Sequence, residues 1–133
     1  MKLRIKGNSL RLRITRPELD RLMSEGRIED AICFASDGRS RLSYSLEHTA
    51  TSSFPTVRFV SPSIEVRIPT AQAQEWSLSD EVGIYASIDL AASGSLDLAV
   101  EKDFACMHGT AEENRDAFPN PRLNAEDDPQ QIV

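Results

Sequence analysis

Residues 2–14 have the sequence KLRIKGNSLRLRI, in which aliphatic and basic side chains alternate on both sides of a Gly-Asn pair. Alternation with a period of two is typical of a half-buried β-strand and not of a helix. The aliphatic positions change from odd to even numbers across the pair, so two facing strands need an even-numbered turn, which Gly7-Asn8 supplies. We therefore predict a β-hairpin with one apolar and one cationic face.

The cationic face of this hairpin belongs to a chain whose formal net charge is -6. With a two-residue turn, Lys2 lies opposite Arg13. Arg4 then lies opposite Arg11, and facing like charges are unfavourable unless negative charge offsets them. Matching acidic positions occur on the outward sides of the last two predicted strands and just beyond them. These positions are Asp89, Asp97, Glu101 and Asp103.

A short helix is predicted after the hairpin. Thr15 and Glu18 have the spacing of a capping box, and Pro17 suits a first helical turn. Gly26 stands where a helix commonly ends. The spacing therefore predicts a helix over residues 16–25.

Further strands and a second helix follow from the apolar spacing along the rest of the chain. Around Asp37-Gly38 the inward positions keep the same parity on both sides, so we predict an odd-numbered, bulged loop rather than a two-residue turn. The predicted strands cover residues 27–34, 41–47, 57–60, 64–68, 82–90 and 96–100, and the second short helix covers residues 69–76.

These elements predict an α+β fold. It consists of a mainly antiparallel, strongly curved or closed β-sheet of about eight strands, with two short helices. No internal repeat and no domain boundary is visible, so residues 1–122 are expected to form a single β-rich domain. Residues 123–133 are acidic and poor in aliphatic side chains, and we expect them to form a mobile tail.

Composition narrows the class of protein. The chain has 133 residues and two cysteines without CxxC spacing, which favours free thiols in a reducing, cytoplasmic compartment, with a single disulfide as the alternative. No apolar run approaches the length of a membrane span, so no membrane association is expected. The acidic balance argues against a nucleic-acid partner, because nonspecific affinity comes mostly from neutralised phosphates.

Three stretches of the chain are distinctive. They are MKLRIKGNSLRLRIT, IEVRIP followed by EWSLSDEVGI, and VEKDFACMHGTAEENRDAFPNP. In these stretches, and over nearly all of residues 1–121, the chain resembles a family of small uncharacterised bacterial proteins. The resemblance implies a bacterial source and a shared organisation. It implies no activity and no functional residue.

Motifs of the common enzyme classes are absent from the sequence. There is no phosphate-binding or dinucleotide-binding glycine motif, no nucleophile elbow and no HExxH. One mixed cluster of thiol, imidazole and carboxylate could hold zinc or another divalent ion, with a packed thiol and a solvated histidine as the alternative. No cofactor is otherwise predicted. The candidate metal ligands are Asp103, Cys106 and His108.

The sequence favours a small non-enzymatic binding or accessory domain. Its partner would be an unidentified protein or an anionic small molecule, and the oligomeric state stays open. A simpler alternative is that the basic hairpin only pairs with the protein's own carboxylates in a solvated network. For an anionic ligand, the candidate residues are Lys2, Arg4, Arg11, Arg13 and Arg67.

The enzymatic alternative is a metal-dependent phosphohydrolase similar to the triphosphate tunnel enzymes, whose antiparallel barrel holds basic and acidic rows inside. The arginines would then bind phosphate oxygens, while Asp89, Glu101 and Asp103 would hold a divalent metal. The first strand here is Lys-Leu-Arg-Ile-Lys, whereas that family has Glu-x-Glu-x-Lys. The carboxylates that hold the metal in that family are therefore missing from this strand.

Two aromatic residues also have alternative roles. Trp76, the only tryptophan, is expected to be an amphipathic core anchor rather than a platform on which a ligand stacks. Phe118 lies between two polar segments and next to Pro119, and we expect it to dock on the domain's own core rather than be presented to a partner.

Overall fold

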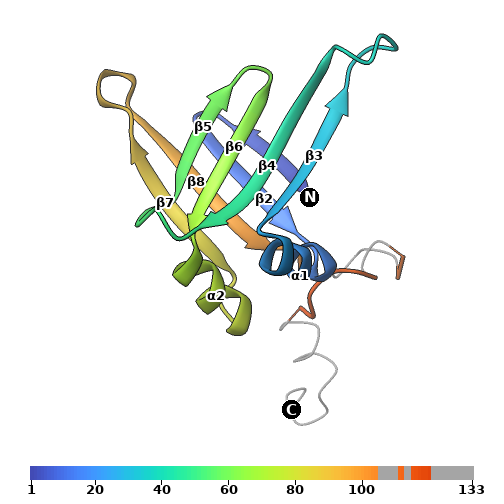
Figure 1. The fold of residues 1–133 in the computed structure, drawn as a ribbon, viewed down its shortest axis with the longest axis vertical. Coiled ribbons are helices and arrows are strands. Elements are labelled where there is room, and N and C mark those ends of the chain that lie inside the picture. The colour runs from blue at the N-terminus through green and yellow to red at the C-terminus, as the bar shows by residue number, and fades with distance from the viewer. Residues whose placement is uncertain (105–110, 113–114, 121–133) are drawn as a thin grey trace, which may run out of the picture.

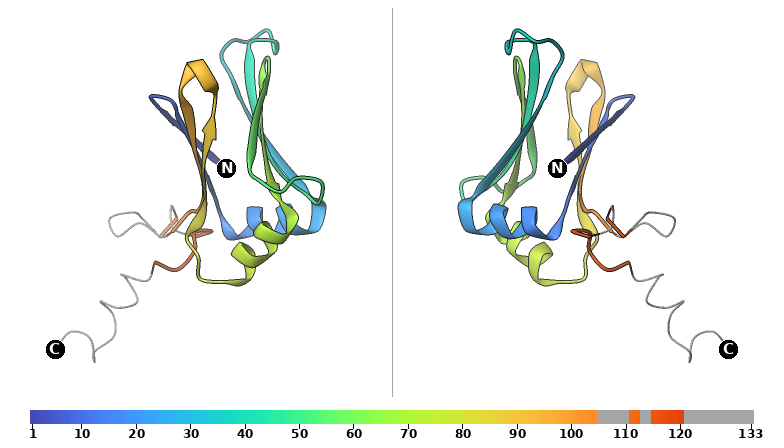
Figure 2. Two further views of the ribbon diagram at one scale, coloured as in Figure 1. Left: turned by 90° about the vertical axis from the view of Figure 1, so that its left-hand side faces the viewer. Right: turned by 90° about the vertical axis from the view of Figure 1, so that its right-hand side faces the viewer.

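The structure is a computed structural model, and it describes residues 1–104, 111–112 and 115–120. Two four-stranded sheets face each other, and two helices close the space between them at one end (Figures 1 and 2). At the other end the sheets diverge, and the turns of all four hairpins lie there (Figure 2).

The ten main elements follow in the order expected from the sequence. In the first half of the chain they are β1 (Lys2–Lys6), β2 (Ser9–Ile14), α1 (Arg16–Glu25), β3 (Arg27–Cys33) and β4 (Arg41–Thr49). In the second half they are β5 (Thr56–Val60), β6 (Ser63–Pro69), α2 (Thr70–Leu78), β7 (Gly83–Asp89) and β8 (Ser95–Lys102).

The strands do not form the single curved or closed sheet that the sequence predicted. The first sheet has the order β1-β2-β8-β7 and the second has the order β3-β4-β6-β5, and neither is closed. Each sheet consists of two antiparallel hairpins joined side by side through a parallel pair, β2 with β8 and β4 with β6. The prediction of an α+β chain with eight strands and two helices is confirmed, whereas the prediction of closure or strong curvature is wrong.

The two sheets have the same construction because the fold contains an internal repeat. The segment β1-β2-α1-β3-β4 corresponds to β5-β6-α2-β7-β8, and each segment gives one hairpin to each sheet. In the first hairpin of each segment the registers agree at one offset: Lys2 pairs with Arg13 as Thr56 pairs with Arg67. The prediction that the chain has no internal repeat is therefore wrong at the level of structure.

The core fills the closed half of the space between the sheets. The helices contribute equivalent positions to it, Leu19 and Leu22 from α1 and Ala73 and Trp76 from α2. Trp76 is fully buried, and its indole nitrogen donates a hydrogen bond to the Val82 carbonyl at 3.3 Å, as expected for a core anchor. The other buried apolar residues are Leu10, Leu12, Ile14, Ile28, Leu46, Val66, Ile68, Ile84, Leu98 and Val100.

Several local predictions are confirmed. The first hairpin turns at Gly7-Asn8 in the predicted register. Thr15 and Glu18 form the predicted capping box of α1, and Gly26 ends the helix in the left-handed region with φ of 87°. Between β3 and β4, residues 34–40 form a loop with the predicted odd number of residues.

Phe118 docks on the domain, as predicted. Its backbone nitrogen donates a hydrogen bond to the Asp103 carbonyl, and its ring meets that of Phe104 edge-on with centroids 6.2 Å apart. The Lys102 ammonium lies 5.5 Å from the centroid of the same ring. Residues 123–133, predicted to form the tail, lie outside the described residues.

Candidate functional site

The predicted cationic side chains lie on the outer face of the first sheet, away from the core. Leu10, Leu12 and Ile14 of β2 are buried, so the alternation of the strand turns Arg11 and Arg13 outward. Strand β8 lies next to β2, and its outward residues include the acidic Asp97 and Glu101. The sequence therefore brings basic and acidic rows together on one surface.

Glu101 of β8 is the centre of this charged surface. Its Oε1 lies 3.0 Å from Arg11 Nε and 3.7 Å from Arg13 Nε. Tyr85 of β7 donates a hydrogen bond of 2.6 Å to Glu101 Oε2. Desolvation, this hydrogen bond and the nearby negative charge raise the pKa of Tyr85 from 10.0 to about 12.

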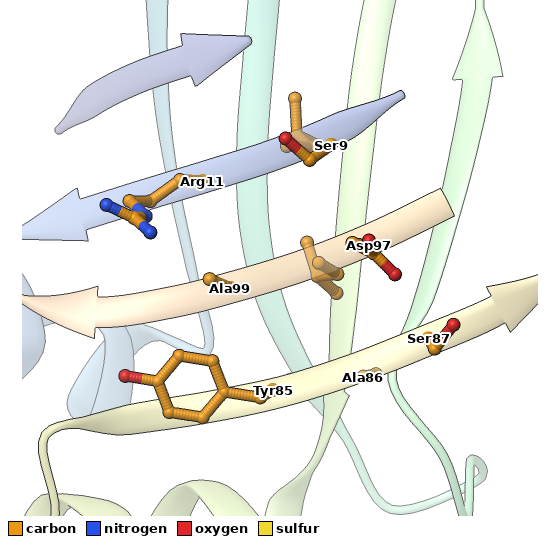
Figure 3. Close-up of a pocket in the computed structure, with 9 residues that line it drawn as sticks. Ser9, Arg11, Tyr85, Ala86, Ser87, Asp97 and Ala99 are labelled. Carbon is orange, nitrogen blue, oxygen red and sulfur yellow. The ribbon is translucent and has the colours of Figure 1, made fainter. Parts of the chain in front are cut away.

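An open depression of about 460 Å³ lies next to Glu101 on the same face (Figure 3). Ala99 forms its floor, Arg11 and Tyr85 lie toward one end, and Asp97 and Ser87 lie toward the other. Charges of both signs lie at the ends of this shallow depression, whose surface is mostly apolar. The lining contains no histidine that could activate a serine hydroxyl.

Two other predicted anion-binding residues have their own carboxylate partners. Lys2 Nζ lies 2.9 Å from Asp103 Oδ2. Arg67 is on the second sheet, where its Nε lies 2.9 Å from Glu47 Oε1. The five predicted residues therefore do not meet in one site, and four of them lie beside acidic side chains.

Arg4 is the predicted anion-binding residue that keeps its charge free within the described part of the chain. Arg4 lies on the outer side of β1. So does Lys6, which was not among the predicted ligands. Neither side chain forms an ion pair with any described carboxylate. A small depression of about 130 Å³ is lined by Arg4, Lys6, Ser9 and Arg11. The free cationic charge of the first sheet is thus concentrated at the turn end of the β1-β2 hairpin.

The predicted metal ligands are tested only in part. Asp103 forms the ion pair with Lys2, and Cys106 and His108 lie outside the described residues. Within residues 1–104, 111–112 and 115–120, no three histidine, cysteine, aspartate or glutamate side chains are placed together so that they could hold a metal ion. Asp89, which the enzymatic alternative required as a ligand, accepts a hydrogen bond from the Ala91 backbone nitrogen instead.

The other histidine, His48, lies on the second sheet. Its Nδ1 lies 2.9 Å from Thr70 Oγ1 at the start of α2, and its buried Nε2 has no hydrogen-bond partner among the described residues. Because this imidazole faces protein on both sides, the contact joins β4 to α2 and presents no reactive group to a ligand.

Sequence analysis missed a groove on the inner side of the molecule, where the two sheets diverge. The groove has a volume of about 220 Å³ and takes its walls from both sheets. Ile5 and Phe59 stand at its mouth and are 61% and 65% exposed, although their strand parity turns them inward. The remaining lining residues are Gly7, Asn8, Ser9, Leu10, Val57, Ile64 and Leu96.

The comparisons with known proteins identify a family without assigning an activity. None of the helices in the described ranges is long and apolar enough to cross a membrane. No curated protein and no solved structure matches the chain. The model of one protein family matches residues 1–122, which is most of the chain. The protein therefore belongs to DUF7009, a family of unknown function.

Proposed function

We propose that this protein is a non-enzymatic binding domain that holds the apolar chain of a ligand in the groove between its two sheets. The observation that carries this proposal is the exposure of Ile5 and Phe59 at the mouth of an apolar groove. Covering a large apolar side chain with another apolar group stabilises a complex by about 1.5–3 kcal/mol. In the free protein Ile5 and Phe59 are uncovered, so a ligand that covers them gains this stabilisation.

The small volume of the groove favours a single alkyl chain as its occupant. Its volume of about 220 Å³ corresponds to about seven groups the size of a water molecule, at about 30 Å³ each. Methylene groups are of similar size, so an alkyl chain of about seven or eight carbons matches the space. A folded partner would need a larger apolar surface than this groove offers.

The composition of the groove supports binding without chemistry. No titratable side chain lines it, and its polar groups are the Asn8 and Ser9 positions at the hairpin turn. General acid-base or nucleophilic catalysis needs a titratable group within hydrogen-bond reach of the substrate. The phosphohydrolase alternative needs basic and acidic rows on the inside of a closed or cupped sheet. The pairing of Arg11 and Arg13 with Glu101 on the outer face therefore favours the binding role. The bacterial source and the cytoplasmic location expected from the sequence form part of this proposal.

An NMR titration with 1-octanol tests the proposal. We expect chemical-shift changes confined to the groove, at Ile5, Leu10 and Phe59, with saturation at a dissociation constant of about 1 mM or tighter. A dissociation constant of about 1 mM corresponds to about 4.1 kcal/mol, which is about 0.5 kcal/mol for each non-hydrogen atom of octanol and lies within the range that small ligands reach. Phe54 is 76% exposed but does not line the groove, so its signals should not move.

Two matched variants complete the test. Ile5→Ser with Phe59→Ser should abolish octanol binding and leave the fold intact, because both side chains are mostly exposed. Phe54→Ser removes an even more exposed aromatic side chain outside the groove and should bind octanol as the parent does. Equal binding by all three proteins would contradict the proposal. So would a stable dimer that dissociates in the Ile5→Ser, Phe59→Ser variant, since the groove would then be covered by a second copy of the chain.

A further inference from the structure

We propose that the ligand is an anionic amphiphile, whose head group binds the basic end of the β1-β2 hairpin while its alkyl chain lies in the groove. This inference rests on the proposed function and names the chemical class of the ligand. It follows from the position of the basic depression, from the charge balance of the hairpin and from the internal repeat.

The groove and the basic depression meet at the same hairpin turn. Ser9 lines both of them, and Gly7 and Asn8 line the groove where the chain turns from β1 to β2. Lys6 is the last residue of β1 and lines the basic depression on the outer side of the same turn. Since only the two-residue turn separates these surfaces, one ligand reaches both by passing over it.

The charge balance of the hairpin calls for an anion at this position. Arg4 and Arg11 are directly opposed across β1 and β2, a pairing that like charges disfavour. Glu101 lies beside Arg11 Nε, but no described carboxylate pairs with Arg4 or Lys6. A bound head group would supply the missing negative charge, with charge-assisted hydrogen bonds from the two arginines.

The internal repeat provides a comparison for this charge cluster. In the equivalent hairpin β5-β6, the position of Arg11 is occupied by Glu65, which lies opposite Arg58 with 4.0 Å between Arg58 Nε and Glu65 Oε2. The position of Lys6 is occupied by Val60. The same hairpin therefore forms without a basic cluster, and the fold does not require one in β1-β2.

The size of the basic depression suits a small head group. A volume of about 130 Å³ corresponds to about four water molecules, enough for a carboxylate or a phosphate. Both head groups share the chemistry that matters here, which is negative charge with several acceptor oxygens. The arginines can bind either one through paired hydrogen bonds, so the test includes both.

The test compares three ligands with eight carbons each, kept monomeric and at low salt. Octyl phosphate and octanoate should bind the parent protein about tenfold or more tightly than 1-octanol, because hydrogen bonds to charged groups are the stronger ones. The preference should weaken as salt is added, since exposed charges are screened. Binding should shift the NMR signals of Arg4 and Lys6 in addition to those of the groove.

Variants separate the head-group site from the groove. Arg4→Gln with Lys6→Gln should remove the preference for the anionic ligands while octanol binding stays unchanged. Arg58→Gln, the matched change in the equivalent hairpin, should keep the preference. Equal affinities for all three ligands in the parent would overturn this inference and leave the proposed function standing. Failure of all three to bind would remove both.

Two further measurements can overturn the inference. Inorganic phosphate that binds as tightly as octyl phosphate would show an anion site unconnected with the groove. Binding to vesicles of anionic lipid, without binding of the monomeric amphiphiles, would show that the hairpin end recognises a membrane surface instead. The expected result is weak binding of phosphate alone, no binding to vesicles and tight binding of octyl phosphate.

Discussion

Replacing Glu101 with glutamine tests the charged outer face of the first sheet. The change keeps the size of the side chain and removes the negative charge beside Arg11, Arg13 and Tyr85. Each partly exposed ion pair contributes about 0.2–1 kcal/mol. The hydrogen bond from Tyr85 persists to a neutral acceptor but loses its charge assistance. We therefore expect the free energy of unfolding to fall by about 1–2 kcal/mol at neutral pH.

The ionisation of Tyr85 gives a second, more specific measurement. Its pKa is raised to about 12 by desolvation first, and then by the hydrogen bond and the negative charge of Glu101. In Glu101→Gln the desolvation remains and the contributions of Glu101 are lost, so the pKa should fall toward 10.0. NMR of the labelled tyrosine ring across alkaline pH measures this value, and Tyr44 serves as an internal reference in the same sample.

The pH dependence of stability has a definite sign. Because the pKa of Tyr85 is higher in the folded protein than in the unfolded chain, its contribution to stability is complete below pH 10 and is lost as pH rises toward 12. This alkaline loss should be smaller in Glu101→Gln. Glu47→Gln is the matched control, since Glu47 pairs with Arg67 at the equivalent position and contacts no tyrosine. An unchanged pKa of Tyr85 in Glu101→Gln would refute the account of this face.

Two further substitutions test the packing, each by chemical denaturation. Gly83→Ala should cost about 1–3 kcal/mol, because a Cβ at Gly83 would lie 2.5 Å from the Val100 carbonyl oxygen. Arg27→Ala at the equivalent position of β3 should cost less than 1 kcal/mol, and equal costs would contradict the clash. Phe118→Ala should cost about 2 kcal/mol through lost ring contacts, and a neutral result would mean that the ring does not dock.

The local structure was predictable from the sequence because it depends on neighbouring residues. The change of parity across Gly7-Asn8 specifies the register of the first hairpin, and the capping box of Thr15 and Glu18 specifies the start of α1. The pairing of hairpins into sheets depends on contacts between distant segments. Alternation shows which face of β2 is apolar, but it does not show that β2 lies parallel to β8 rather than closing a barrel.

The repeat escaped sequence analysis because few of its residues are identical. Between the hairpins β1-β2 and β5-β6, the aligned residues that match are Arg4 with Arg58, Ser9 with Ser63, Arg13 with Arg67 and Ile14 with Ile68. What the hairpins do share is the alternation of apolar positions around a two-residue turn. The internal repeat can therefore be found by comparing hydrophobic patterns rather than residue identities.

Of the two candidate surfaces, the charged outer face of the first sheet was predictable from the sequence, and the apolar groove was not. The basic and acidic rows were identified from strand parity, and the ion pairs of Glu101 confirm that the rows meet. The groove was missed because inward-facing positions were equated with buried positions. Ile5 and Phe59 do face inward, but near the hairpin turns the sheets are too far apart to cover them.

A comparison of the two repeats distinguishes charges that form ion pairs within the fold from charges that are free to bind a ligand. Arg13 lies beside Glu101 across the parallel pair β2-β8, and Arg67 lies beside Glu47 across the equivalent pair β4-β6. Because the same contact occurs at both equivalent junctions, the pairing of the hairpins explains it, and the presence of Arg13 and Arg67 does not by itself indicate a ligand. The charge of Lys6 has no counterpart in the second repeat, and a charge that only one repeat carries is where a function beyond folding is to be sought.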